Sequence, residues 1–482
     1  VYKRQLYNIY KTDFSQNGAA GKMVEYRHMT VNGAVNYAYD DRYVATFSFA
    51  ADGSDNYRPG NRWGFYPSLG LGWIVSRERF LRDSRTVDLL KLRASVGKNG
   101  WDPMGEMRYL WEGYYTGRGG LNTGNSEHTW HGGTALSYLP NPGIFAEKSL
   151  KYDAGIDLRL WNRLSLNVDL FLEKRSGIVT QDWMIPGASG VDNPPYRNIG
   201  RMTNKGFEVQ LSWADRIGDF NYALTGMASY NSNKVDYMAE VVTVPTAART
   251  GRRLDALFGY VADGFYDWDD FDVGGELREG LPKPTFGAVQ PGDIKYKNLN
   301  GDTVIDENDQ TAIGDSYLPK LQYSFSLAAS YKGFDLFALF QGAAGRDVNL
   351  LDAPLQNIAF RDNGNVYGIA EGRWAYYPEQ GIDTRATATY PRLSLQDNSN
   401  NYRNSTLWKR SGDFLKLRNV ELGYTFAQPS LSKAGISKIR IYLSGVNLLT
   451  VSKLMRDYDI DPEILSGHPA LKSYNLGLTV TF

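Results

Sequence analysis

The stretch Leu471–Phe482, LKSYNLGLTVTF, determines how the rest of the chain is interpreted. Apolar residues alternate strictly with small or polar ones along it. The apolar set is Tyr474, Leu476, Leu478, Val480 and Phe482, and the intervening set is Ser473, Asn475, Gly477, Thr479 and Thr481. A period of two places each set on its own face of a β-strand. Such a strand fits a soluble β-sandwich, and equally the closing strand of an outer-membrane barrel with lipid outside and water inside.

The same alternation predicts thirteen β-segments along the chain, whereas amphipathic helices of useful length are scarce. The clearest segments are 150–160, 164–173 and 321–331. The others are 24–38, 43–50, 66–76, 88–97, 206–213, 220–230, 334–342, 414–426, 438–448 and 473–482. The sequence therefore predicts an all-β fold.

The links between these segments alternate between short and long without a break in phase. The short links are 40–41, 77–87, 161–163, 214–218, 332–333 and 427–437, and the long ones are 51–65, 98–149, 174–205, 231–320, 343–413 and 449–472. A sandwich has no reason to gather every long loop at one end. A transmembrane antiparallel up-and-down β-barrel does, with short periplasmic turns and long extracellular loops. If Phe482 is periplasmic, each long loop lies outside.

The polar face of the strands supports the barrel over a multidomain sandwich. Asp153, Asp157, Asp169 and Glu173 alternate with apolar residues. Carboxylates are costly in a dry sandwich core but are solvated in a wet lumen.

Composition narrows the function classes. Lys plus Arg and Asp plus Glu both number 53, so the balanced charge does not indicate nucleic-acid binding. The absence of cysteine excludes disulfides, thiolate metal sites and a cysteine nucleophile. Tyr (33), Phe (21), Trp (11) and Gly (50) suit a β-rich protein with interfacial aromatic girdles and tight turns. We find no serine elbow, HExxH or phosphate-cradling motif, and we expect no enzyme.

The ends of the chain predict a piece of a larger barrel. No stretch is apolar enough for a transmembrane helix, and residues 1–22 lack the apolar region of a signal peptide. Thirteen strands is an odd number, whereas single-chain bacterial barrels have even ones. We therefore expect one domain over 23–482 that lacks N-terminal strands. Residues 1–22 would be the remnant of an extracellular loop, and we expect residues 1–5, which resemble an adapter-derived scar, not to be native.

Four regions of the sequence resemble the SusC/RagA family of TonB-dependent outer-membrane receptors. They are Tyr37–Phe80 continuing into Leu90–Gly97, Asn204–Glu208, Pro291–Gly314 and Trp408–Phe482. Their motifs include Arg62–Ser68, Pro291–Tyr296, Leu415–Val420, Val446–Leu448 and Asp461–Glu463. The resemblance covers residues 23–482 in order, and it matches only the C-terminal part of the family's barrel. The family's plug, TonB box and N-terminal extension are absent from this sequence.

The resemblance implies a barrel of about 22 strands. It also implies a SusD-like surface lipoprotein as partner, energy from TonB through the missing N-terminal part, and insertion by the outer-membrane assembly machinery of a Bacteroidota-like Gram-negative cell. The implied function is import of oligosaccharides, or of peptides in some members. Two rivals stay open: a TonB-dependent receptor for siderophores or cobalamin, and a passive or structural barrel.

Aromatic residues in two of the long loops are candidate ligand contacts. Loop 98–149 contains Trp101, Trp111 and Trp130, and loop 231–320 contains Tyr260, Tyr266 and Trp268 near several aspartates. An aromatic face packs against sugar C–H groups while neighbouring carboxylates accept hydroxyl hydrogen bonds. The alternative is that these rings form the loops' own cores, or the contact with a lid protein.

The segment 298–309 resembles a calcium loop. Its oxygen ligands would be Asn298, Asn300, Asp302, Asp306 and Asp309. Asn at the first position, Thr at the position of the turn glycine and the short Asp309 at the last position should weaken binding. A turn held by side-chain-to-backbone bonds is the alternative, so calcium would be at most a structural ion.

The terminal aromatic residue has a further interpretation. Phe482 on a closing strand resembles the signal that the outer-membrane assembly machinery recognises. Phe482 could also serve as one more girdle aromatic, and the two roles are compatible.

Overall fold

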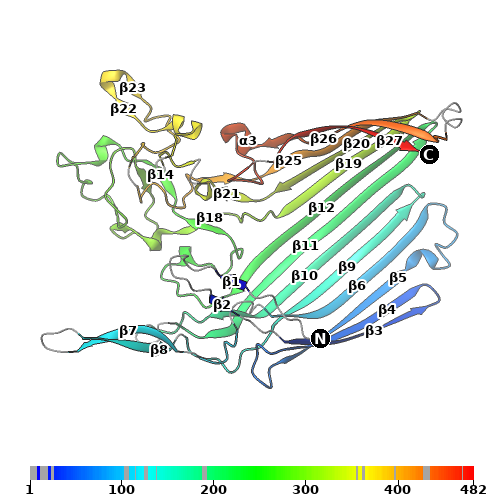
Figure 1. Ribbon diagram of the computed structural model, residues 1–482, viewed down its shortest axis with the longest axis horizontal. Coiled ribbons are helices and arrows are strands. Elements are labelled where there is room, and N and C mark those ends of the chain that lie inside the picture. The colour runs from blue at the N-terminus through cyan, green and yellow to red at the C-terminus, as the bar shows by residue number, and fades with distance from the viewer. Residues whose placement is uncertain are drawn as a thin grey trace.

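One antiparallel sheet of thirteen strands forms the body of the protein in the computed structural model (Figure 1). The structure describes residues 8–10, 20–22, 27–102, 108–113, 115–123, 129–136, 138–186, 193–353, 357–360, 364–395, 398–426, 435–468 and 470–482. The sheet strands are β3 (His28–Tyr39), β4 (Tyr43–Ser54), β5 (Trp63–Ile74), β6 (Val87–Trp101), β9 (Glu147–Leu160), β10 (Leu164–Gln181), β11 (Tyr196–Ile217), β12 (Phe220–Tyr237), β19 (Leu321–Tyr331), β20 (Phe334–Ala344), β25 (Phe414–Phe426), β26 (Lys438–Ser452) and β27 (Ser473–Thr481).

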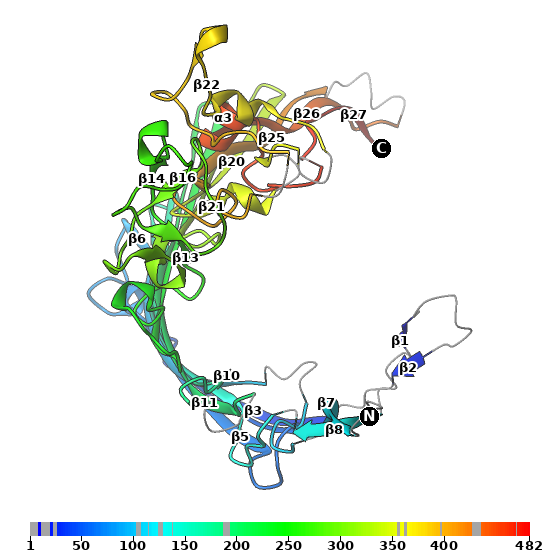
Figure 2. The same ribbon diagram turned by 90° about the vertical axis from the view of Figure 1, so that its left-hand side faces the viewer.

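The thirteen strands follow one another in the sheet in chain order, from β3 at one edge to β27 at the other. Seen from the end that carries the long loops, the sheet curves into an open arc (Figure 2). This is the up-and-down arrangement that the sequence predicts.

Each of the thirteen predicted segments is one strand of this sheet, and β19 and β25 have the predicted bounds. The largest difference concerns 174–205, which the sequence predicts as a long outside loop. There β10 continues to Gln181 and β11 already begins at Tyr196. The ladder between them extends past Arg175, which pairs with Met202. Backbone pairing needs no apolar face, so the ladder continues where the alternation ends.

Neighbouring cross-strand rows show the two faces of the sheet. One row runs through Leu71, Ala94, Ala154, Leu170, Phe207, Tyr230 and Leu321. The adjacent row runs through Gly72, Arg93, Gly155, Asp169, Glu208, Ser229 and Gln322. Because successive side chains point to opposite faces, the first row belongs to an apolar face and the second to a polar one.

Tight turns join the strands at one end of the sheet. In three of them both central residues have positive φ, namely Asp40 and Asp41 (51° and 50°), Trp161 and Asn162 (53° and 52°), and Lys332 and Gly333 (47° and 89°). Two positive φ angles are the mark of type I′ hairpins, whose twist matches that of the strands.

Aromatic side chains gather at this same short-turn end. Ring contacts join Tyr39 to Tyr43 at 6.4 Å, Trp161 to Trp213 at 6.5 Å and Phe334 to Tyr424 at 4.5 Å between centroids. The arrangement is the girdle expected where a barrel wall passes through a membrane interface.

The long connections emerge at the opposite end, on the left of Figure 1, and contain small elements of their own. Their paired strands are β7 (Tyr115–Thr123) with β8 (Thr129–Leu136), β13 (Leu257–Gly259) with β18 (Thr311–Gly314), β14 (Ala262–Phe265) with β16 (Ile294–Tyr296), β15 (Lys283–Pro284) with β17 (Val304–Ile305), β21 (Asp347–Asn349) with β24 (Lys409–Ser411), and β22 (Tyr376–Tyr377) with β23 (Ile382–Asp383). A further pair, β1 (Asn8–Tyr10) with β2 (Ala20–Lys22), precedes the sheet.

Helices are short, as the sequence predicts. Those in the described residues are the 3₁₀ helices η1 (Val75–Arg77), η3 (Pro245–Ala247), η4 (Trp268–Asp270), η5 (Glu307–Asp309), η6 (Leu350–Asp352), η8 (Gly368–Gly372) and η9 (Pro378–Gln380), and the α-helix α3 (Lys453–Tyr458). Within the described ranges, no helix has the length and apolar character needed to cross a membrane.

Candidate functional site: the polar wall and the loops at its outer end

A network of charges occupies the middle of the polar face and centres on Arg93 of β6. Its guanidinium lies 2.5 Å from a carboxylate oxygen of Asp169, 3.1 Å from one of Asp157 and 3.9 Å from one of Asp153. Gly155 makes this possible, because a Cβ there would lie 2.7 Å from the Arg93 Cζ. An arginine can thus reach from β6 across β9 to β10.

The charge network borders a hollow on the polar face. Its walls include Arg93, Asp157, Asp169, Glu208, Gln210 and Gln322. These carboxylates, amides and one guanidinium offer acceptors and donors to a polar ligand or to another protein segment. The three aspartates confirm that the polar face of the strands is charged. Sequence reasoning placed them in the lumen but did not foresee that one arginine gathers them.

The two largest loops fold together into what we call the loop platform, the described residues of 238–320 and 345–413. Its apolar core includes Tyr260, Ile294, Tyr296, Val348 and Trp408, all of which are buried. Tyr260 and Trp408 come from different loops, and the backbone of Tyr260 forms an isolated β-bridge with that of Ser405. The platform therefore has the dry interior that the strand wall lacks.

A buried carboxylate, Asp293, holds the platform together. Its Oδ1 accepts hydrogen bonds from the Nδ2 atoms of Asn398 (2.9 Å) and Asn401 (2.8 Å), and the Arg392 Nε lies 2.7 Å from the same oxygen. Its Oδ2 also accepts the backbone N–H of Gln290. Asp293 belongs to the motif Pro291–Tyr296, to which sequence reasoning gave no role beyond the resemblance. In this structure the motif ties the two loops of the platform together.

Two of the predicted ligand contacts are buried inside the platform, Tyr260 in the core above and Tyr266 in a smaller cluster with Phe271, Leu277 and Val289. Tyr260 and Tyr266 are each 2 % exposed. Tyr260 packs against Phe286 and Tyr296, and Tyr266 packs against Phe271. Their ring faces are therefore covered, and these two rings correspond to the alternative in which loop aromatics build the loop's own core. The prediction that they stack on a ligand is corrected accordingly.

The three tryptophans of loop 98–149 have different surroundings. Trp111 is half-buried against a small core of Tyr57, Leu110, Tyr138 and Ile144. Trp130 lies in β8, and its side chain is outside the described part of the structure. Trp101 ends β6 opposite Glu147 and is 57 % exposed. Of the three, Trp101 is the one whose described side chain is open to a ligand.

Trp268 is exposed, and its neighbour Asp267 reaches the hairpin β22–β23 through Arg385. Trp268 opens η4, is 56 % exposed, and donates its backbone N–H to the Asp267 side chain. The same Asp267 carboxylate lies 3.4 Å from Arg385, and the Arg385 guanidinium lies 3.9 Å from the centroid of the Tyr376 ring. Tyr377, the neighbour of Tyr376 in the hairpin β22–β23, is 53 % exposed. The structure thus joins the segment of Trp268 to the hairpin of Tyr376 through Asp267 and Arg385, although the two segments lie more than a hundred residues apart.

Arg385 also fixes the charge state of this corner. It donates two hydrogen bonds to the Asp383 carboxylate, at 3.0 and 2.8 Å. These bonds lower the pKa of the Asp383 carboxyl below its ordinary value. Asp383 is therefore ionised at neutral pH and acts as a hydrogen-bond acceptor.

The candidate calcium loop, 298–309, is closed by its own carboxylates. The Asp309 oxygens accept the backbone N–H groups of Leu299 (2.7 Å) and Asp306 (2.9 Å). Asp302 accepts from Val304 (2.9 Å), while Asn298 and Asn300 bond within the same turn. In the described part of the chain, no three His, Asp or Glu side chains converge as a metal site. The geometry thus matches the turn held by side-chain-to-backbone bonds, and calcium stays a prediction.

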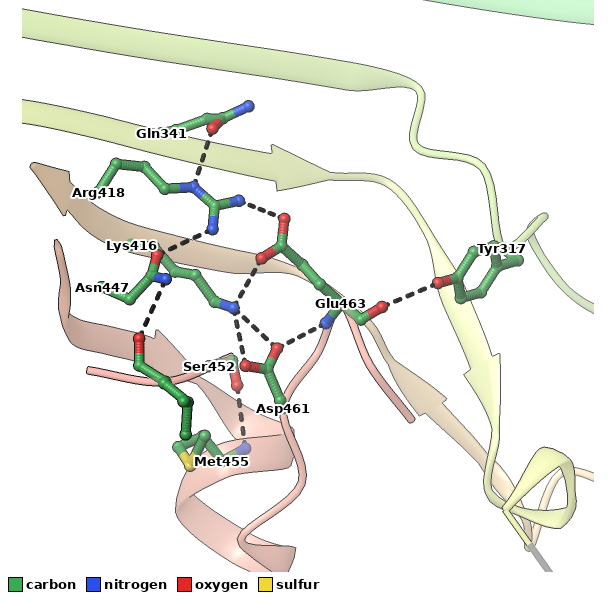
Figure 3. A network of polar contacts seen from close by, with 10 residues as sticks. Tyr317, Gln341, Lys416, Arg418, Asn447, Ser452, Met455, Asp461 and Glu463 are labelled. Atoms are coloured by element: carbon green, nitrogen blue, oxygen red, sulfur yellow. Dashed lines mark hydrogen bonds and ion pairs between the residues drawn. The ribbon is translucent and has the colours of Figure 1, made fainter. Parts of the chain in front are cut away.

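A third network joins the last outer loop to the wall (Figure 3). The ammonium of the buried Lys416 in β25 lies 2.8 Å from an Asp461 oxygen and 2.7 Å from a Glu463 oxygen. Arg418 donates to Glu463, to the Gln341 side chain (2.9 Å) and to the Asn447 side chain (3.2 Å). The motifs 415–420, 446–448 and 461–463 therefore meet in space, although sequence reasoning assigned no contact to them.

The network of Figure 3 changes the acidity of Glu463. Burial alone would raise the pKa of this carboxyl, but hydrogen bonds from Arg418 and Lys416 outweigh burial and lower the pKa below its usual value.

The predicted assembly residue Phe482 follows β27 at the short-turn end and is exposed.

Comparison with known proteins identifies the family. Residues 7–448 match the family model described as TonB dependent receptor-like, beta-barrel. The chain belongs to this family. The TonB-dependent receptor P26 of Formosa agariphila is 29 % identical over 508 residues, which cover 98 % of this chain and 48 % of that protein. The TonB-dependent receptor SusC of Bacteroides thetaiotaomicron is 26 % identical over 485 residues, covering 93 % and 43 %.

A solved structure has the same fold. The RagAB peptide importer in its open-open state superposes with a TM-score of 0.71 and 22 % identity, over 98 % of this chain and 48 % of that one. The protein is thus a β-barrel of SusC/RagA type from the outer membrane, as the sequence motifs indicate. The chain spans about half the length of the curated relatives it matches.

Proposed function

We propose that this TonB-dependent receptor chain belongs to an importer of glycan fragments that works with a SusD-like surface lipoprotein. The observation that carries the proposal is the outer corner of the loop platform. There the exposed Trp268 follows Asp267, which pairs with Arg385, and Arg385 in turn lies over the Tyr376 ring and bonds the ionised Asp383. Aromatic faces with adjacent acceptors are what a sugar needs, because its C–H groups stack and its hydroxyls donate.

The polar wall provides a path below this corner. The hollow beside Arg93 and Asp169 is lined by groups that exchange hydrogen bonds readily with water and with hydroxyls. A glycan released at the platform would therefore meet polar groups along the wall. TonB would supply the energy for import, as the family name indicates, and a lipoprotein lid would close over the platform. SusC among the relatives supports this partnership.

A second candidate is a peptide importer. The structural relative RagAB is described as one. The wall observation that favours it is the clustering of Asp153, Asp157 and Asp169 around one arginine, because charged groups of both signs suit peptide termini and side chains. Siderophore or cobalamin uptake and a passive barrel remain rivals, but no described residue cluster favours either over the first two.

The discriminating experiment uses the full-length receptor carrying this chain, with its lipoprotein, against a glycan array and a peptide library. We expect glycan binding, and we expect Trp268→Ala to weaken it roughly tenfold, in line with the loss of one aromatic contact. Trp183→Ala is the matched control, because Trp183 is also exposed at the outer end but lies in the loop between β10 and β11. Binding of peptides alone, or glycan binding untouched by Trp268→Ala, would overturn the glycan proposal.

A further inference from the structure

The link between β5 and β6, residues 75–86, differs from the two- to three-residue turns that join the neighbouring strands at the short-turn end. It begins with η1, whose residues Val75 and Ser76 are buried. The chain then bends back through backbone hydrogen bonds from Leu81 and Arg82 to the Glu78 carbonyl, at 3.0 and 2.8 Å. The link is thus a folded segment of defined shape, and we call it the interface segment.

Glu78 holds the interface segment against the apolar side of the wall. Its carboxylate accepts hydrogen bonds from the Tyr43 hydroxyl (2.7 Å), the Trp73 Nε1 (3.1 Å) and Arg42 (2.8 Å). Tyr43 pairs with Trp73, and Trp73 with Leu92, so both rings belong to the row of apolar, outward-facing side chains. The interface segment therefore lies at the level of the aromatic girdle, on the lipid side of the sheet.

The negative charge of Glu78 is already stabilised by these contacts. Hydrogen bonds from Tyr43 and Trp73 lower the pKa of its carboxyl, and Arg42 balances its charge. Glu78 is consequently ionised and directed into the wall. It does not neutralise the arginines on the other side of the segment.

The outward side of the interface segment is basic and carries one aromatic ring. Four exposed arginines follow one another, namely Arg77, Arg79, Arg82 and Arg85. Arg77 pairs with Asp41 at 3.2 Å and Arg82 lies 3.8 Å from Asp83. Arg79 and Arg85 have no acidic partner within 4.0 Å in the part of the chain that the structure describes. Phe80, between them in sequence, is 72 % exposed.

We propose that the interface segment binds the head groups of anionic phospholipids in the membrane leaflet at the short-turn end. A guanidinium matches a phosphate through two parallel hydrogen bonds, and it binds phosphate more specifically than an ammonium does. Arg79 and Arg85 supply such groups, and no carboxylate among the described residues competes with a phosphate for them. Phe80 supplies an apolar ring of the kind that settles at the boundary between head groups and acyl chains.

The position of the segment favours lipid over a protein partner. Because Glu78 fastens it to outward-facing girdle residues, its neighbours in a membrane are lipid molecules. Basic groups beside a membrane are attracted to anionic lipid, and the attraction falls off within a Debye length. An acidic periplasmic protein would have to reach around the wall into the interface to make the same contacts. The inference rests on membrane insertion and is independent of which substrate the receptor imports.

The test compares lipids on the purified receptor that carries this chain. Phosphatidylglycerol and phosphatidylcholine are titrated into the detergent-solubilised protein and counted by native mass spectrometry, and quenching of tryptophan fluorescence by brominated forms of both lipids gives a second readout. We expect the wild type to prefer phosphatidylglycerol. The double variant Arg79→Gln/Arg85→Gln should bind it about 25-fold more weakly, at roughly fivefold per arginine.

Arg216→Gln is the matched control, because Arg216 is exposed at the same end but bonds the Gly218 carbonyl and lies 3.9 Å from Asp219. It should leave the lipid preference unchanged, and all variants should keep the gel shift of a folded barrel on heating. Equal binding of both lipids by the wild type, or full phosphatidylglycerol binding by the double variant, would overturn the proposal. Loss of an acidic protein partner in the double variant, with lipid binding intact, would overturn it in favour of a protein-binding surface.

Discussion

The strand wall and the loop platform are made by one chain but are stabilised in two different ways. In the wall, Leu170 faces outward and Asp169 faces the hollow, and neither is buried. In the platform, Trp408 is 1 % exposed and Asp293 is fully buried. The wall is held by a ladder of backbone hydrogen bonds and has lipid on one face and water on the other, whereas the platform has a buried core like that of a small soluble domain. Removing the same type of residue should therefore cost a different amount of stability in the two regions.

A carboxylate deletion should show this difference most strongly. Asp293→Ala leaves Arg392, Asn398 and Asn401 without their shared partner, and we expect a loss of about 3–5 kcal/mol in platform stability. Hydrogen exchange should rise across the platform while the wall strands keep their protection.

The control for this change is Asp169→Ala in the wall. Asp169 pairs with Arg93 on the solvated face, and Asp157 would remain as a partner of that arginine, so removing Asp169 should cost about 0–1 kcal/mol. If both substitutions loosened the platform and wall alike, the separation of the two regions would be refuted.

The two faces of the wall can be compared by placing the same charge on each. Leu170→Lys puts an ammonium on the apolar face and should cost about 2–4 kcal/mol near the middle of the membrane. Asn167→Lys puts it on the polar face beside Asp157 and should be tolerated. Urea-dependent folding into lipid vesicles measures both, and equal costs would mean that the apolar face does not meet lipid.

The candidate calcium loop offers a smaller test within the platform. Asp309→Asn places an amide where one carboxylate oxygen now accepts a backbone N–H, and we expect a local cost of about 1–3 kcal/mol. Hydrogen exchange of 298–309 measures it, with Asp272→Asn in an exposed platform turn as control. If calcium binds, its addition should raise protection of 298–309 in the wild type and less in Asp302→Asn. Unchanged exchange on calcium addition would reject the metal.

The smallest expected effect is a dependence on pH in the last outer loop. Because the pKa of Glu463 is lowered in the folded protein, its contribution to stability is complete above the unfolded value of about 4.3 and is lost as the pH falls through the folded value. Exchange of residues 453–468 should therefore rise in acid. Glu463→Gln should remove this dependence, and a variant that kept it would show that another group titrates.

The wall could be predicted from sequence because its rule is local. Alternation in 321–331 and 414–426 predicted the bounds of β19 and β25. In β25 the apolar positions slip by one residue after Leu417, where the ladder with β26 has a register shift. The rule failed at 174–181 and 196–205, where the strands extend without alternating apolar residues. There the pairing of Arg175 with Met202 depends on a partner strand already in place.

The platform could not be predicted in the same way. Tyr260 and Trp268 are both aromatic residues among aspartates, yet one is buried and the other exposed. The burial of Tyr260 depends on contacts with residues near Ser405, more than a hundred positions away. The partner of Asp267, Arg385, is equally distant. Residue types predict which interactions a loop can make. Which of its side chains are buried and which are exposed depends on contacts with distant residues, which no local pattern predicts.

The Lys416 network has a mechanical consequence for the end of the chain. In the sheet that the structure describes, β27 is hydrogen-bonded to β26, and the loop between the two strands is fastened to β25 through Asp461 and Glu463. A pulling force applied at Phe482 would unzip β27 one residue pair at a time and would then reach this fastening. Extension would pause there, because Lys416 and Arg418 have to separate from Asp461 and Glu463 before the force reaches β26. The last outer loop therefore acts as a stop that confines mechanical damage to the final strand.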